Sequence, residues 1–264
     1  MDCETEKRLF YAELPFAPVL RRLFRLVLPR RSHALLDAPL ERTAADARNE
    51  LRYVEIVGAD GDPFLRHRYA EGVRWRQVLR AYQPPPARVL DLGAGNGAVE
   101  LAMSAGGYRV VSVDAGWNDD ARRLGVLRVV ADAAALPFRT ASFDALLMLE
   151  TVEHLPDVSA AARECARVLH ASAPALVTTP PRWRYALRPD PHFSIRFLLL
   201  RSPRTQRRIA ARRGFAEQHH YVDRIYGSVS ELARALASFR TEEVLSRSRL
   251  PKRWFWDAVV MRKR

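Results

Sequence analysis

Three glycines and an aspartate in the middle of the chain have the types and spacing of a nucleotide-binding turn. The segment from Arg88 to Gly97 reads RVLDLGAGNG, an apolar strand that leads into a turn containing Gly93, Gly95 and Gly97. Glycine permits positive φ angles and lets a ligand approach the backbone closely. Asp114 ends the next apolar run, 21 positions after Gly93, near the spacing of about 20 at which an acid meets a ribose. Together these residues predict a site for a nucleotide-containing ligand.

The elements that must position this turn alternate between strands and helices. Strands are predicted from residue 88, over 109–114, over 127–132, over 142–149 and over 175–179, with helices over about 98–107 and 158–169. Such alternation implies right-handed crossovers and a parallel sheet that binds its ligand at the carboxyl ends of the strands. Two last strands, over about 243–250 and 255–262, are expected to complete the sheet as an antiparallel pair, and Ser230 to cap the helix before them.

Two segments fall outside this alternation. Residues 1–85 show no strand pattern and end at three consecutive prolines, so we predict a helical extension or lid before a domain over 86–264. Residues 180–225 are rich in arginine, proline and histidine, and we expect an inserted cap there. Residues 16–31 have a basic amphipathic pattern, which is typical of a helix packed on the core, of a lid, or of a helix on an anionic membrane.

Composition narrows the class of protein further. The chain has 264 residues, 48% of them hydrophobic, enough for one α/β domain with appendages. Its net charge of +13 favours binding to polyanions. However, only three of its 43 basic residues are lysines, and this excess of arginine is also typical of a GC-rich coding bias. Two cysteines exclude a disulfide framework, and Cys165 is expected in the core. The acidic start is unlike a secretory signal, so we expect a cytoplasmic protein, in peripheral contact with the inner face of a membrane if residues 16–31 bind lipid.

From residue 88 to about 180 the chain resembles the class I S-adenosylmethionine-dependent methyltransferases. The resemblance is carried, in the family's order, by VLDLGAGNG, Asp114, ADAAALPF, SFDALLMLETVEHLPD and the segment from ARECARVLH to ALVTTP. It implies an α/β fold with a Rossmann-like, seven-stranded, mostly parallel sheet and helices on both faces. The cofactor-binding residues that it implies are Asp91, Gly93, Gly95, Gly97, Asp114, Asp132, Ala133 and Glu150. Asp114 would hold the ribose hydroxyls, and Asp132 and Ala133 would flank the adenine.

A nicotinamide-dependent dehydrogenase is the main competing interpretation of the glycines. Three observations oppose it. The turn reads GAGNG and lacks the spacing G-x-G-x-x-G, Asp132 is present on the adenine side, and the sheet is predicted to end in an antiparallel pair.

Methyl transfer is an in-line displacement at a sulfonium methyl, so the protein must align the acceptor and, for a hydroxyl acceptor, remove its proton. Two histidines are candidate catalytic residues. His154 follows the fourth predicted strand, and an imidazole with a pKa near 6.5 suits a general base. His192 belongs to the predicted cap and is expected to face the same cleft. A cap on the following helix is the structural alternative for His154.

Glu150, Glu153 and His154 form E-x-x-E-H, which resembles the metal-binding motif of ubiquinone-pathway and small-RNA O-methyltransferases. Two carboxylates and an imidazole suit Mg²⁺ or Mn²⁺. Pro181 stands where the RNA enzymes have asparagine. In the alternative without metal, Glu150 contacts the cofactor and Glu153 begins a helix.

The sequence therefore predicts an enzyme, an S-adenosylmethionine-dependent methyltransferase that acts on an oxygen of a small-molecule, glycan or lipid-linked acceptor. Arginines of the cap are expected to bind a phosphate or carboxylate on it: Arg182, Arg184, Arg188, Arg196 and Arg201. An RNA 2′-O-methyltransferase and a non-catalytic binding protein with the cofactor fold are the alternatives.

Overall fold

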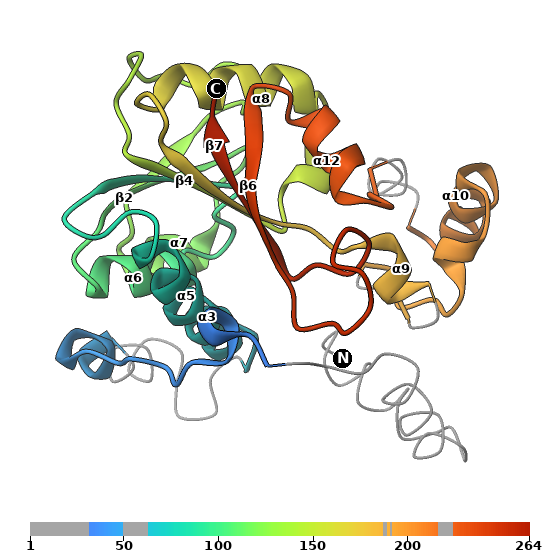
Figure 1. Cartoon of the computed structure of the whole chain (residues 1–264), viewed down its shortest axis with the longest axis horizontal. Coiled ribbons are helices and arrows are strands. Elements are labelled where there is room, and N and C mark those ends of the chain that lie inside the picture. Colours follow the sequence, from blue (N-terminus) through green and yellow to red (C-terminus); the bar gives the residue numbers. More distant parts are fainter. Residues whose placement is uncertain (1–31, 50–62, 187–188, 191, 216–223) are drawn as a thin grey trace.

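The chain folds around one twisted sheet of seven strands in the order β3-β2-β1-β4-β5-β7-β6 (Figure 1). The computed structural model describes residues 32–49, 63–186, 189–190, 192–215 and 224–264. The strands are β1 (Arg88–Leu92), β2 (Arg109–Asp114), β3 (Arg128–Val130), β4 (Ala145–Leu149), β5 (Pro174–Thr178), β6 (Phe239–Leu245) and β7 (Ala258–Lys263). The first five are parallel, and β7 is antiparallel to both β5 and β6. The predicted Rossmann-like sheet is confirmed.

The helices cover both faces of this sheet (Figure 1). They are α3 (Ala34–Asp37), α5 (Pro63–Arg80), α6 (Ala98–Ala105), α7 (Asp119–Leu124), α8 (Val158–Val168), α9 (Arg182–Tyr185), α10 (Pro203–Arg212) and α12 (Val229–Ala235), with 3₁₀ turns η1 (Val152–His154) and η2 (Leu198–Leu200). Residues 44–49 are also helical.

Side chains alternate between two cores because successive strand residues point to opposite faces of the sheet. Leu146 and Met148 of β4 pack with α8 and α12, whereas Leu147 and Leu149 pack with α5 and α6. Every residue of β4 is buried, as expected of a parallel strand covered on both sides. Cys165 is fully buried in the first core, so its prediction as a core residue is confirmed.

The last two strands and the helix before them differ from the sequence prediction. Strand β6 begins at Phe239 and ends at Leu245, and the next residue, Ser246, donates its hydroxyl to the carbonyl of Phe255. The Ser230 cap is wrong. Ser228 has the extended backbone of a cap residue and accepts the amide of Glu231 at 3.2 Å, whereas Ser230 lies inside the first turn.

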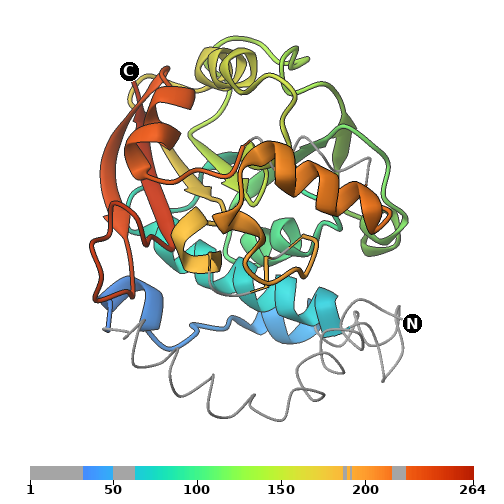
Figure 2. The same cartoon turned by 90° about the vertical axis from the view of Figure 1, so that its right-hand side faces the viewer.

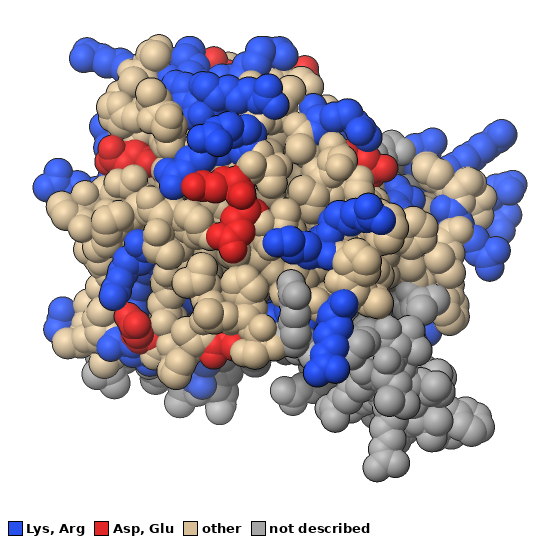
Figure 3. Space-filling model, in the orientation of Figure 1, with Lys and Arg blue, Asp and Glu red and all other residues tan. Residues whose placement is uncertain are grey.

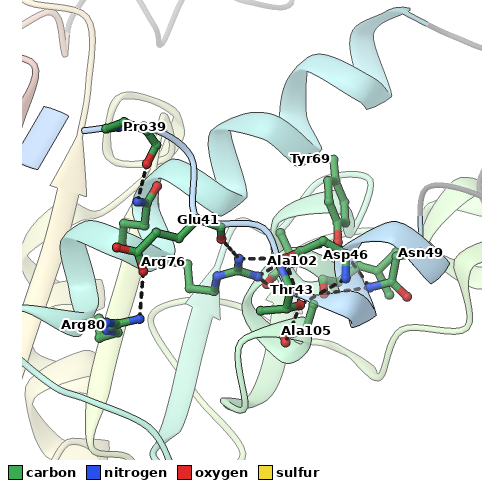
Figure 4. A network of polar contacts seen from close by, with 12 residues as sticks. Pro39, Glu41, Thr43, Asp46, Asn49, Tyr69, Arg76, Arg80, Ala102 and Ala105 are labelled. Carbon is green, nitrogen blue, oxygen red and sulfur yellow. Dashed lines mark hydrogen bonds and ion pairs between the residues drawn. The ribbon is translucent and has the colours of Figure 1, made fainter. Parts of the chain in front are cut away.

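A buried polar network ties residues 32–49 to α5 and α6 (Figure 4). The guanidinium group of Arg76 donates to both carboxylate oxygens of Asp46, at 2.9 and 2.8 Å. Tyr69 donates to the same carboxylate at 2.7 Å. Both Asp46 and Arg76 are buried. Burial opposes ionisation of Asp46, but the hydrogen bonds from Arg76, Thr43 and Tyr69 hold its pKa well below its usual range.

We expect Asp46→Asn to lower the free energy of unfolding by about 3–5 kcal/mol at pH 7, because it leaves the Arg76 charge buried without its partner. Glu41→Gln is the matched control. It breaks an ion pair with Arg80 whose partners are 62% and 60% exposed, and exposed pairs contribute at most about 1 kcal/mol.

Urea unfolding as a function of pH checks this network further. A carboxyl whose pKa is lowered in the folded state stabilises the protein above its unfolded pKa of about 4, and this stability is lost as the pH falls. The difference between wild type and Asp46→Asn should therefore shrink from pH 7 to pH 3. A constant difference would show that ionised Asp46 is not the source.

The segment after β5 folds into α9, η2 and α10, which stand together in front of the carboxyl edge of the sheet (Figure 2). Its described residues have a small core of their own, formed by Phe193, Leu198, Leu199, Ala210 and Ile225. Exposed arginines gather at the end of the molecule formed by α10 (Figure 3): Arg204, Arg208, Arg212 and Arg213.

Residues 16–31, and Arg188 of the predicted cap, lie outside the described residues, so the predictions made for them stay predictions. Within the part of the chain that the structure describes, no helix is long and apolar enough to cross a bilayer. The division at residue 85 also stays a prediction.

Candidate functional site

The glycine turn after β1 has the left-handed backbone that its sequence predicts. Gly93 has a φ of +75°, and a β-carbon there would overlap the side chain of Thr151. Gly95 has a φ of +57°, but a β-carbon there would meet no atom of the described residues within 4 Å. Gly93 is thus required by packing within the protein, whereas Gly95 borders open space in which a ligand fits.

Two cavities meet at this turn, and both are lined by Gly93 and Glu150. The smaller one, of about 580 Å³, is lined by the ends of β1, β2 and β4, by residues 131–133 and by His154. The larger one, of about 750 Å³, lies between the turn, α5 and the cap, and His192 lines it. The site therefore has two compartments with a common border.

Acidic residues predicted to hold a nucleoside lie together in the smaller cavity. Asp114 at the end of β2 accepts the amide of Gly95 at 2.8 Å, and Asp132 accepts the amide of Ala134 at 2.8 Å. Ala133 lies beside them in the cavity wall. Arg128 of β3 donates to the carbonyl oxygens of Gly95 and Gly116, so it joins the two loops that border this compartment.

Two predicted cofactor residues, Asp91 and Gly97, line neither of these cavities. Asp91 is buried within β1, and burial, with the nearby charge of Glu100, raises its pKa to about 7. Gly97 is the first cap residue of α6, and a β-carbon there would overlap Val126. Gly93 and Gly95 form the cavity surface, whereas Asp91 and Gly97 lie behind it and support the turn.

The two candidate catalytic histidines lie side by side. Nε2 of His154 is 2.8 Å from Nε2 of His192, and the ring centroids are 4.7 Å apart. One imidazole must donate and the other accept, so the tautomers of the pair are linked. The cap brings His192 there through Asp190, which is buried and accepts the amides of His192, Phe193 and Ile195 at 3.0, 2.7 and 3.0 Å.

Glu153 completes this cluster. It belongs to η1 with His154, is fully buried, and neither carboxylate oxygen has a hydrogen-bond partner of normal geometry among the described residues. Burial and the charge of Glu150 raise its pKa to about 8, which the hydroxyl of Thr179 offsets in part. The ligand atoms of Glu153, His154 and His192 all lie within 4.8 Å of one another. A carboxylate without a partner beside two imidazoles fits a divalent cation.

Glu150, predicted to bind both the cofactor and the metal, lies outside this cluster. Glu150 directly follows β4 and has a φ of +54°, whereas Glu153 belongs to the 3₁₀ turn η1. The side chain of Glu150 is exposed to the cavities, and desolvation by the surrounding protein raises its pKa. Glu150 instead stands at the border of the two cavities.

Sequence reasoning missed several residues of the larger cavity. Arg68, Glu71 and Trp75 reach it from α5, and their spacing of three and four positions is the one signal that they share a helix face. Arg247 and Asp257 reach it from either end of the segment between β6 and β7, and no motif in the sequence marks them.

Residues 90–175 match the family model described as "Methyltransferase domain". The match covers about a third of the chain and supports the predicted resemblance to the class I S-adenosylmethionine-dependent methyltransferases. Domains of this class take their methyl group from S-adenosylmethionine, as the smaller cavity with Asp114 and Asp132 suggests.

Curated relatives carry more specific names. The ubiquinone biosynthesis O-methyltransferase of Xanthomonas axonopodis is 30% identical over 122 residues, which are 40% of this chain and 48% of the relative. The demethylmenaquinone methyltransferase of Thermus thermophilus is 32% identical over 134 residues, 45% of this chain and 61% of the relative. The chain thus spans about half the length of the curated relatives it matches. Among solved structures, the PH0226 protein of Pyrococcus horikoshii has a TM-score of 0.50 and 17% identity, over 88% of this chain and all of its own; this likeness shows the fold alone.

Proposed function

We propose that this protein transfers the methyl group of S-adenosylmethionine to an oxygen atom of a small-molecule acceptor. The observation that carries the proposal is the pair of histidines at the border of the two cavities. His154 lines the compartment that suits the nucleoside, and its hydrogen-bonded partner His192 lines the other. A proton acceptor is thus placed where the donor and the acceptor meet.

The smaller cavity holds the adenosine part of the methyl donor. Asp114 accepts from the ribose hydroxyls, and Asp132 with Ala133 borders the adenine. Arg68, which is paired with Glu71 at 2.7 Å, lines the larger cavity together with Gly95 and Asn96, and its guanidinium group suits the carboxylate of the methionine part. In this orientation the sulfonium methyl faces Glu150 and the histidine pair, and the acceptor enters from the cap side.

The histidine pair supplies the base. A neutral His154 accepts the proton of the acceptor hydroxyl while the oxygen attacks the methyl carbon, and His192 shares the resulting positive charge through their hydrogen bond. Glu153, buried beside them, stabilises that charge when it is ionised. As the alternative to this base mechanism, Glu153, His154 and His192 would hold Mg²⁺ or Mn²⁺, and the imidazoles would then serve as ligands instead of the base. When bound, the ion would lower the pKa of a hydroxyl and orient its oxygen.

The names of the relatives support a small-molecule acceptor, because they refer to ubiquinone biosynthesis and demethylmenaquinone. An oxygen acceptor is supported by the histidine pair and by the word O-methyltransferase in the first of those names. Glycan, lipid-linked and RNA acceptors stay predictions from the sequence, and one experiment separates them.

That experiment measures transfer of labelled methyl groups from S-adenosylmethionine into three cell fractions, namely small metabolites, lipids and total RNA. We expect the label in the metabolite fraction. A loss of at least tenfold after treatment with a chelator, restored by Mg²⁺ or Mn²⁺, would assign the cluster to a metal. Label confined to RNA or lipid would overturn the small-molecule acceptor. Labelling that a chelator leaves unchanged would overturn the metal.

A further inference from the structure

A second polar cluster lies in the larger cavity, on elements that do not carry the histidine pair. Arg184 of α9 donates to Oδ1 of Asp257 at 2.9 Å, and Arg247 donates to the same oxygen at 3.1 Å. The backbone amide of Arg247 donates to Oδ2 of Asp257 at 2.6 Å. All three residues line the cavity.

This cluster has more positive charge than its one carboxylate balances. The side chain of Asp257 is only 7% exposed. It is nevertheless ionised, because the charges of Arg184 and Arg247 outweigh its burial and lower its pKa. Nε of Arg247 is buried and has no hydrogen-bond partner within the described part of the chain. The second ion pair of Arg247, to Asp37, is long at 3.9 Å. Two guanidinium groups of the cavity wall therefore share one closely bonded carboxylate, and Arg247 has only the longer contact with Asp37 besides it.

Other charged residues stand near this cluster. Glu71, across the cavity, is already paired with Arg68 at 2.7 Å and lies 3.5 Å from His67. Arg74 stands close enough that its own pKa is lowered, by burial first and then by the charge of Arg247. Glu150 is the other carboxylate of the cavity wall. It stands at the border with the smaller cavity, and its charge interacts with that of Arg184.

A purely structural role would require only part of this arrangement. The contact between Arg184 and Asp257 already joins the cap to β7. Arg247 adds a second guanidinium group to Oδ1 of Asp257, which already accepts from Arg184. The aromatic rings of Trp75 and Tyr185 line the same cavity and offer apolar walls beside the two cations.

We propose that Arg184 and Arg247 bind an anionic group of the methyl acceptor, a carboxylate or a phosphate, while a hydroxyl of the acceptor faces His154 and His192. A guanidinium group is suited to either anion because its planar array of donors matches their oxygens. This inference rests on the proposed function, since it assigns the larger cavity to the acceptor. It narrows the acceptor to small anionic molecules and makes Arg247, which no motif marks, a specificity-determining residue.

Calorimetry with three probes of similar size tests this inference on the full chain saturated with S-adenosylhomocysteine. Benzoate and phenyl phosphate carry the two anions, and benzyl alcohol is neutral. We expect both anions to bind at least tenfold more tightly than benzyl alcohol at the same ionic strength, and their ratio identifies the preferred anion.

Arg247→Gln should weaken both anions at least tenfold and leave benzyl alcohol and S-adenosylhomocysteine unchanged, whereas Arg247→Lys should restore part of the preference. Arg208→Gln, which removes an exposed arginine of α10, is the matched control and should change nothing. Equal binding of the three probes by wild type, or an equal loss of all three in Arg247→Gln, would overturn the inference while the proposed function stands. If S-adenosylhomocysteine itself fails to bind, the result overturns both the proposed function and this inference.

Discussion

Gly95→Arg is expected to abolish binding of S-adenosylhomocysteine, with a loss of affinity of at least about 1000-fold by calorimetry. The physical reason is the open space at this position. A β-carbon on Gly95 meets no atom of the described protein within 4 Å, so the new side chain extends into the volume that the ligand requires. The loss arises from exclusion of the ligand, because the fold has room for the substitution.

Gly214→Arg is the matched control. Gly214 also has a left-handed backbone, with a φ of +83°, and likewise no described atom lies within 4 Å of a β-carbon there. It follows α10 in the cap, away from both cavities. Both variants incur about 1–2 kcal/mol of backbone strain and should lose similar thermal stability, but Gly214→Arg should bind the ligand within threefold of wild type. Equal losses of affinity in the two variants would contradict the assignment of the turn.

His154→Ala is expected to reduce methyl transfer to the true acceptor by about 100-fold to 10,000-fold, the usual contribution of a general base. Binding of S-adenosylhomocysteine should change little, because Asp114 and the glycine turn hold the nucleoside. His170→Ala is the control. His170 lies 3.9 Å from Asp144 and is 51% exposed, and its loss should leave turnover unchanged. Full turnover by His154→Ala would remove the histidine pair from the mechanism.

Titration with Mn²⁺, monitored by calorimetry, separates the two roles of the Glu153–His154–His192 cluster, which are to bind a metal and to supply the base. Wild type should bind one ion per chain, and His154→Ala and His192→Ala should each weaken it at least tenfold. His170→Ala should again resemble wild type. A protein that binds no Mn²⁺ but still loses turnover in His154→Ala would use the histidines as a base alone.

Local sequence pattern predicted the parts of this fold that depend on neighbouring residues. The apolar run before Gly93 and the acid at Asp114 belong to a strand–turn–helix–strand unit of about 30 residues, within which each element limits the next. Continuous apolar runs such as Ala145–Leu149 indicated strands covered on both sides, and the structure buries every residue of that strand. The seven-stranded, mostly parallel sheet was predicted from the family resemblance, and the order of its strands was not predicted.

The composition of the site could be predicted only in part, because its contacts join distant positions. His154 and His192 are separated by 38 positions, and their contact depends on Asp190 organising the cap loop through three backbone amides. The E-x-x-E-H spacing predicted Glu150 and Glu153 in one metal site, but only Glu153 joins His154 and His192 in the cluster, while Glu150 acts on it through its charge. Arg247 has no local signal at all.

The central claim is that the smaller cavity holds the nucleoside and directs the sulfur toward the histidine pair. The most direct measurement is a crystal structure with S-adenosylhomocysteine and Mn²⁺. We predict ribose hydroxyls within hydrogen-bonding distance of Asp114, the sulfur facing the border of the two cavities, and one Mn²⁺ on Glu153, His154 and His192. A nucleoside bound outside the Asp114 cavity, or a sulfur directed away from the two histidines, would contradict the account.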